Sequence, residues 1–156
     1  DLMAITLMEL RGFKSNEFAK FHPGGNLGKK LTLTTGAIAK QNTQPSVHLL
    51  TSVKEVIIAI SKSRMGATVV LDDADNIIGI ITDGDIRRML EQHNSIQELK
   101  AADILHKQHI TISSDTLALE AFDLMKAHDI SQLIVADQGQ YKGMIHIHDL
   151  MKEGIL

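Results

Sequence analysis

The sequence contains no cysteine, so neither disulfides nor thiolate metal ligands contribute to its fold. We therefore expect a protein of the reducing cytoplasm. Apolar runs stay well short of the roughly 20 residues that a membrane helix needs, and we recognise no signal peptide. The net charge of −3 is made of mixed charges along the chain. It argues against a nucleic-acid surface, because phosphate binding requires a clustered basic face.

An internal repeat is the main feature that the sequence does contain. Residues 79–90 read GIITDGDIRRML, and residues 143–151 give a partial copy, GMIHIHDLM. The first glycines of the two segments lie 64 residues apart (143 − 79), and Asp85 and Asp149 keep that offset. Two copies in a chain of 156 residues, of which 44% are hydrophobic, favour a tandem pair with a shared core over a longer repeat array.

Each copy predicts the same succession of elements, β-α-β-β-α, because an apolar stripe at helical spacing precedes two β-rich runs and a closing helix. The expected strands are 47–49, 67–71 and 77–81 in the first copy and 110–112, 133–135 and 141–145 in the second; the expected closing helices are 84–91 and 147–153. A sheet of about three strands is marginal alone. We therefore predict an α+β fold in which residues 47–94 and 101–154 pack into one module.

The residues before the repeat have a different character. Residues 2–10 are apolar on nearly every side of a helix, which suits burial in a larger core, so we expect residues 1–31 to be the end of an upstream domain. Within them, residues 22–30 (HPGGNLGKK) are rich in glycine and lysine. They fit either an anion-binding turn or an interdomain turn with a solvated basic edge. Residues 32–46 are expected to form a polar linker with one apolar patch around Ile38.

The two units resemble a known family. Paired β-α-β-β-α units that end in Gly-apolar-apolar-Thr/polar-x-x-Asp-apolar before a helix resemble a CBS-domain pair, or Bateman module, over about residues 36–154. The segments FHPGGNLGKKL, TDGDIRR and HIHDL more specifically resemble the C-terminal half of bacterial arabinose 5-phosphate isomerases of the Kdo and lipopolysaccharide pathway. In that family a sugar isomerase (SIS) domain precedes the CBS pair. The resemblance implies a regulatory module of an enzyme that interconverts ribulose 5-phosphate and arabinose 5-phosphate.

The resemblance also implies a nucleotide site at Thr82 and Asp85. A carboxylate accepts hydrogen bonds from ribose hydroxyls, while a threonine hydroxyl and a helix N-terminus donate to phosphate. The alternative for this pair is a helix cap. Arg87 and Arg88 are the nearest cations for a phosphate or carboxylate, and their alternative is a solvated helical face.

Two further segments complete the expected binding site. Met65, Gly66 and Ala67 occupy the place where CBS pairs contact a base through backbone groups, and residues 130–132 are their counterpart in the second copy. In that copy Asp149 is retained but His146 replaces the threonine, so we expect one strong first site and one weak or vestigial second site. His146 and His148 would share one side of an extended strand, but we expect polar strand-end residues there and no metal.

His22 resembles a catalytic group of the isomerases, since a histidine that titrates near neutrality moves protons in aldose–ketose isomerisation. We expect it to act only in the intact enzyme and predict no turnover by this chain alone. The expected ligand is the nucleotide-sugar CMP-Kdo, ahead of an adenine or cytidine nucleotide. We further expect a face-to-face homodimer of CBS pairs and a tetramer of the intact enzyme. The alternative function is a ligand-free assembly module that holds the isomerase subunits together.

Overall fold

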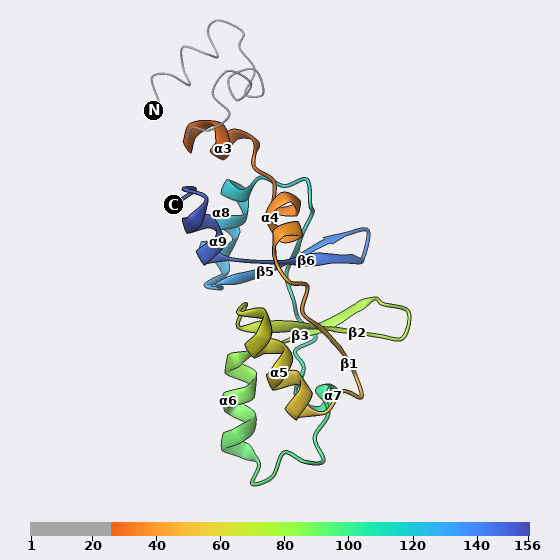
Figure 1. Cartoon of the computed structure of the whole chain (residues 1–156). Helices are drawn as coiled ribbons and strands as arrows, with labels where there is room; N and C mark the ends of the chain where they lie inside the picture. The colour runs from red at the N-terminus through yellow and green to blue at the C-terminus, as the bar shows by residue number, and fades with distance from the viewer. Residues whose placement is uncertain (1–25) are drawn as a thin grey trace, which may run out of the picture.

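The computed structural model describes residues 26–156, which form two similar units, each built on a three-stranded sheet (Figure 1). The first unit consists of β1 (Ser46–His48), α5 (Val53–Ser63), β2 (Ala67–Leu71), β3 (Ile77–Thr82) and α6 (Asp83–Gln92). The second consists of β4 (Thr111–Ile112), α8 (Ala118–His128), β5 (Gln132–Asp137), β6 (Gln140–His146) and α9 (Ile147–Lys152). In each unit a parallel pair is followed by an antiparallel hairpin. The predicted α+β fold of two β-α-β-β-α units is confirmed.

Local sequence signals account for most of these elements. Ser52 caps α5 by accepting a hydrogen bond from the backbone N–H of Glu55 at 3.3 Å. In the first hairpin, Asp72 accepts hydrogen bonds from the backbone N–H groups of Ala74 and Asn76 at 2.9 and 2.8 Å, as expected for an Asp-rich turn. The second hairpin turns at Gln138 and Gly139, whose positive φ values of 52° and 78° suit a tight two-residue loop.

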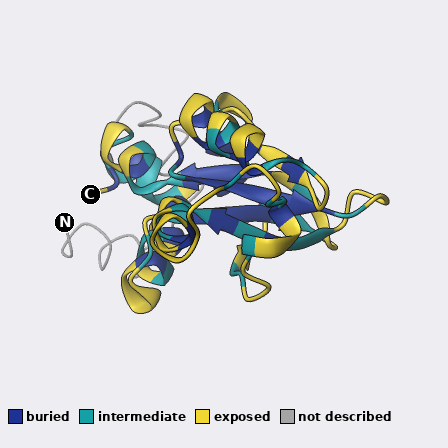
Figure 2. Ribbon diagram, turned by 90° about the horizontal axis from the view of Figure 1, so that it is seen from below, coloured by how far each residue is buried: buried dark blue, intermediate teal, exposed yellow. Residues whose placement is uncertain are grey.

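The two sheets pack face to face, and helices cover their outer sides. Figure 2 shows the buried strands in the middle of the molecule with exposed helical faces around them. Met65, Val69 and Leu71 of the first unit share one hydrophobic cluster with Ile134 and Met144 of the second. Separate clusters lie beneath the helices of each unit. Each sheet is therefore buried on both faces, which explains why all five residues of β2 are buried.

The segment that leads into each unit packs on the other unit. The helices α3 (Asn26–Thr32) and α4 (Thr35–Gln41) precede the first unit in sequence, yet Ile38 and Ala39 lie in the core cluster of the second. The short helix α7 (Ala101–Ile104) precedes the second unit, yet Ala101 lies in the core cluster of the first. The two units are thus interleaved.

The packing of α4 on the second unit corrects the prediction of a polar linker at residues 32–46, because α4 is a folded part of that unit's core. Its sequence, TGAIAKQ, has one large apolar residue and spans only two turns, so it carries no helical periodicity. α3 shows that the later part of the glycine-rich segment is helical. His22 and the helix expected at residues 2–10 lie outside the described residues. No helix within residues 26–156 is long and apolar enough to cross a membrane.

Candidate functional site

A cavity of about 380 Å³ lies where the two units meet. Its lining includes Met65, Gly66 and Thr82 from the first unit and Ile130, Ser131, Gln132 and His146 from the second. Corresponding backbone hydrogen bonds shape its two sides: Asp83 donates to the Gly66 carbonyl at 2.9 Å, and Ile147 donates to the Ser131 carbonyl at 2.8 Å. The structure therefore brings together Thr82 and both segments that were expected to contact a base.

The chain reaches this cavity through two left-handed turns. Arg64 ends α5 with φ 57°, and Asp129 ends α8 with φ 51°. A residue in this conformation stops a helix and redirects the chain. In both units the redirected chain enters the middle strand of the sheet at the mouth of the cavity. Ala67, the next predicted site residue, is fully buried in β2 and does not line the cavity.

Thr82 and Asp85 form a capping box at the start of α6. The Thr82 hydroxyl accepts from the Asp85 backbone N–H at 3.3 Å, and Asp85 Oδ2 accepts from the Thr82 backbone N–H at 2.8 Å. Both side chains are therefore engaged in the alternative role that the sequence left open, that of a helix cap.

Asp85 is also held on its other oxygen. Arg88 donates to Asp85 Oδ1 at 2.7 Å, and His106 Nε2 contacts the same oxygen. These partners leave Asp85 only 5% exposed and place it on a smaller cavity, of about 200 Å³, outside the shared one. Arg87 is exposed and lines neither cavity. The structure thus does not bring Asp85, Arg87 or Arg88 to the cavity that Thr82 lines.

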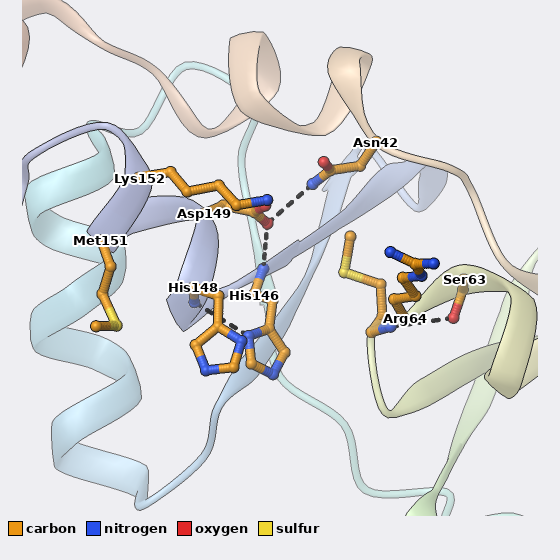
Figure 3. A pocket seen from close by; sticks show the side chains of 9 residues that line it. Asn42, Ser63, Arg64, His146, His148, Asp149, Met151 and Lys152 are labelled. Atoms are coloured by element: carbon orange, nitrogen blue, oxygen red, sulfur yellow. Dashed lines mark hydrogen bonds between the residues drawn. The ribbon is translucent and has the colours of Figure 1, made fainter.

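The second unit presents its motif more openly (Figure 3). A cavity of about 510 Å³ is lined by His146, His148, Asp149, Met151 and Lys152 of this unit, by Ser63, Arg64 and Met65 of the first, and by Asn42. Asp149 Oδ2 accepts from the His146 backbone N–H at 2.7 Å and from Asn42 Nδ2 at 2.9 Å. Asp149 shares its cavity with the cationic side chains of Arg64 and Lys152, neither of which is bonded to it, whereas the cation on the cavity of Asp85, Arg88, is hydrogen-bonded to that aspartate.

The two aspartates are contacted in equivalent ways. Asn42 and His106 lie 64 residues apart (106 − 42), the same offset as Asp85 and Asp149. Each follows a crossing helix and reaches the motif of the unit on which that helix packs: Asn42 contacts Asp149, and His106 contacts Asp85. An ionisable partner therefore covers the first carboxylate, and a neutral amide contacts the second.

His146 replaces threonine as the cap of α9. Its Nδ1 accepts a hydrogen bond from the His148 backbone N–H at 3.0 Å, which places the proton of the neutral ring on Nε2. Burial, with a smaller contribution from His148, lowers the pKa of His146 below its ordinary value. The neutral ring is therefore the form that caps the helix.

The expectation that His146 and His148 extend from one strand is wrong. β6 ends at His146, and His148 lies in the first turn of α9, because the cap bends the chain at this point. The two rings lie 4.4 Å apart between centroids. Within residues 26–156, no group of three or more His, Asp or Glu side chains is placed to hold a metal ion.

Sequence reasoning missed Asn42, Arg64 and Lys152, which line the cavity of the second unit. A signal for Asn42 was present, since the repeat extends upstream beyond the first strand. The backbone bond from Val53 to the Leu99 carbonyl, at 3.1 Å, has an equivalent from Ala118 to the Leu33 carbonyl, at 2.8 Å. The offset is 66 residues between Leu33 and Leu99 (99 − 33) but 64 between Asn42 and His106, so a comparison of the two segments pairs Asn42 with His106 only across a two-residue gap.

The chain resembles known proteins at two levels. It is 36% identical over 157 residues to arabinose 5-phosphate isomerase KdsD of Yersinia pestis and 35% identical over 157 residues to KdsD of Escherichia coli K12. Both alignments cover 100% of this chain and 48% of the relative, so the chain spans about half the length of the curated relatives it matches. The CBS domain protein PAE2072 from Pyrobaculum aerophilum, solved in complex with AMP, has a TM-score of 0.67 at 22% identity. That match covers 76% of this chain and 90% of PAE2072 and shows a shared fold.

The family model of the CBS domain matches the chain twice, over residues 41–92 and residues 101–155. These ranges coincide with the two β-α-β-β-α units and together cover more than half of the chain. The resemblance expected from the Thr-x-x-Asp and His-x-x-Asp motifs is thereby confirmed. The chain belongs to the CBS-domain family, as a tandem pair similar to the C-terminal half of the KdsD isomerases.

Proposed function

We propose that this CBS pair binds a small anionic nucleotide or nucleotide-sugar between its two units and so regulates an arabinose 5-phosphate isomerase. The observation that carries the proposal is the cavity lined by Met65, Gly66 and Thr82 on one side and by Ser131 and His146 on the other. A ligand there contacts both units at once. Its binding is therefore sensitive to how the units sit on each other, which is what a regulatory module requires.

The chemistry of the adjoining cavity supports an anionic ligand. Arg64 and Lys152 supply positive charge from opposite units, and Asp149 supplies a carboxylate that suits ribose hydroxyls. A volume of about 510 Å³ falls within the usual range of small-molecule sites, roughly 300–1,000 Å³. CBS protein PAE2072 provides a precedent, since it was solved with AMP.

The similarity to KdsD sets the biological context of the proposal. In a protein of that type, the ligand acts on ribulose 5-phosphate/arabinose 5-phosphate interconversion in Kdo and lipopolysaccharide biosynthesis. CMP-Kdo, the activated form of the end product, is the first candidate, followed by cytidine and adenine nucleotides. The catalytic role of His22 stays a prediction for the intact enzyme.

A thermal-shift series with CMP-Kdo, CMP, AMP and ATP tests ligand binding. A ligand at 100 times its dissociation constant adds about 2.7 kcal/mol of stability, which raises the melting temperature of a chain of this size by roughly 5–10 °C. Arg64→Asn should reduce the shift, since it removes the charge while asparagine tolerates the left-handed backbone. Lys62→Asn is the matched control: it removes the same charge from α5 at a residue outside the cavity. No shift with any of the four compounds would reject the proposal.

An assembly role without a ligand is the second candidate, and exposed apolar side chains favour it. Each of the four helices that cover the sheets carries one: Ile58 on α5, Leu90 on α6, Leu119 on α8 and Met151 on α9. Leu90 and Met151 are 55% and 57% exposed. If these helices form the proposed homodimer, Leu90→Glu should yield monomers in sedimentation velocity while the exposed-charge control Glu91→Gln leaves the dimer intact. A monomeric unmodified chain would reject this role.

A further inference from the structure

We infer that the cavity of the second unit transmits ligand binding to the chain that precedes residue 26, and that Asn42 is the residue that couples them. This inference rests on the proposed function, because it assigns regulation to one of the two motif sites. It reverses the expectation that the first copy provides the dominant site.

The preceding chain enters the described structure through the second unit. Thr35 and Gly36 at the start of α4 donate backbone hydrogen bonds to the Thr116 and Ser114 carbonyls at 2.8 and 3.0 Å. Lys29 of α3 forms a salt bridge of 3.2 Å with Glu153, the residue that ends α9. Both helices of this entry segment, residues 26–41, are therefore fixed to elements of the second unit.

Asn42 joins this entry segment to the motif aspartate. It is the C-terminal cap of α4, and its Nδ2 donates to the Met144 carbonyl at 3.1 Å and to Asp149 Oδ2 at 2.9 Å. Figure 3 shows Asn42 and Asp149 pointing toward one another at one side of the cavity. Among residues 26–156, no group donates a hydrogen bond to Oδ1 of Asn42 or to Oδ1 of Asp149.

These two acceptor atoms give a ligand a way to join α4 to α9. A ligand with neighbouring hydroxyl donors, such as a ribose, bridges Asn42 and Asp149 from within the cavity, while Arg64 and Lys152 take its acidic group. These bridging contacts form only when α4 is packed on the second unit. The ligand therefore favours the state in which α4 is packed there, and it orders the entry segment.

Within residues 26–156, the aspartate of the first unit has no comparable connection to the entry segment. This aspartate is held by Arg88 from its own helix and by His106, which follows α7 in the middle of the chain. Neither residue belongs to the segment through which the preceding chain arrives. A ligand that displaces His106 from Asp85 changes contacts within the CBS pair alone.

Amide hydrogen exchange on the complete chain, measured first without ligand, tests this coupling. Asn42→Ala removes a hydrogen bond to a charged group, so exchange in residues 26–41 should accelerate roughly tenfold. His106→Ala is the matched control, because it deletes the equivalent side chain on the first unit and should leave exchange in residues 26–41 unchanged. Equal effects of the two variants, or no effect of Asn42→Ala, would overturn the inference.

The second arm adds CMP and, separately, AMP at saturating concentration. The nucleotide that binds should slow exchange in residues 26–41 of the unmodified chain. In Asn42→Ala it should produce a smaller thermal shift, because one ligand contact is lost, and it should no longer slow that exchange. Binding without slowing in the unmodified chain overturns the coupling. If neither CMP nor AMP binds, the ligand-free comparison decides the Asn42 contact, and the thermal-shift series with all four compounds decides the proposed function.

Discussion

Two different side chains perform the same capping task in the two units. Thr82 caps α6 through its hydroxyl, and His146 caps α9 through Nδ1, while Asp85 and Asp149 return the hydrogen bond to the cap backbone in both. A hydroxyl cap does not titrate near neutral pH, but an imidazole cap does. Having histidine instead of threonine at position 146 therefore makes the start of α9 sensitive to acid.

The stability supplied by His146 should be lost on acidification. Because burial lowers the pKa of His146 below 6.5, the unfolded chain takes up a proton near that pH while the folded chain still excludes it. The contribution of the neutral ring is complete above about pH 6.5 and is lost as the pH falls toward the folded pKa. Urea unfolding at about pH 7.5 and about pH 5.5 should therefore show a larger loss for the unmodified chain than for His146→Thr.

His146→Thr copies the residue at the equivalent position of the first unit and keeps a capping side chain. At about pH 7.5 its unfolding free energy should stay within roughly 0.5 kcal/mol of the unmodified chain. His128→Thr, at an exposed position on α8, controls for the replacement of a histidine by threonine. An identical pH dependence in the unmodified chain and His146→Thr would show that the cap does not titrate in this range.

Thr82→Ala should cost about 1 kcal/mol of stability, because the Asp85 backbone N–H loses its capping acceptor. Thr82→Ser retains the hydroxyl and should cost only a few tenths of that loss. Chemical denaturation at neutral pH measures both. If the two variants were equally destabilised, the lost methyl group, and not the cap, would be responsible.

At the scale of elements, the crossing segments require glycine at one position of each hairpin. Gly79 of β3 lies directly beneath the lead-in to the second unit, so a Cβ there would overlap the carbonyl oxygen of His106 and the side chain of Leu105. Gly143 of β6 is the equivalent residue, and a Cβ on it would lie 3.2 Å from Ala39. The repeated glycine is thus explained by the close approach of the crossing chain.

Gly79→Ala should destabilise the protein by about 1–3 kcal/mol, the usual cost of overpacking. Gly84→Ala provides the control, since a Cβ at this helical position meets only ordinary contacts, the nearest at 3.4 Å. It should leave stability unchanged or raise it by up to about 1 kcal/mol. Differential scanning fluorimetry compares the two. Equal melting temperatures would mean that Leu105 and His106 move away from residue 79 without loss of stability.

Elements with a strong local signal were predictable from the sequence, and those held by distant contacts were not. The hairpins and the helices α5, α6, α8 and α9 have β-rich runs, caps or apolar stripes of their own. α4 has none of these; it is helical because Ile38 and Ala39 fill the core of a unit that lies about a hundred residues away. The prediction of a polar linker at residues 32–46 was wrong for this reason.

The candidate site was predictable only in part, for a similar reason. Residues 65–67 and 130–132 were predicted as equivalent base-contact segments of the two copies. The structure places residues 65, 66 and 130–132 on one cavity, and Ala67 outside it. The position of Asp85 depends on His106, and that of Asp149 on Asn42. Neither contact follows from spacing within a motif, because His106 was assigned to the second unit and Asn42 to the linker.

At the scale of the whole molecule, neither unit is complete by itself. A chain that ends after residue 97 lacks α7 and exposes Val69 and Leu71, which pack on the second sheet. We predict that it shows no cooperative unfolding transition in urea when followed by circular dichroism, whereas residues 1–156 show a single one. A sigmoidal transition of the shorter chain would show that the first unit folds independently.

The interleaving also sets what can be exchanged between proteins. A recombination point placed between the units separates α4 from the core that it fills and α7 from the core that it fills. Duplication or transfer of one β-α-β-β-α copy therefore delivers an unfinished domain. Only a fragment that runs from α3 through Ile155, which packs in the core of the second unit, carries a complete set of partners. The pair, entry helices included, is the smallest portion of this chain that another protein could acquire intact.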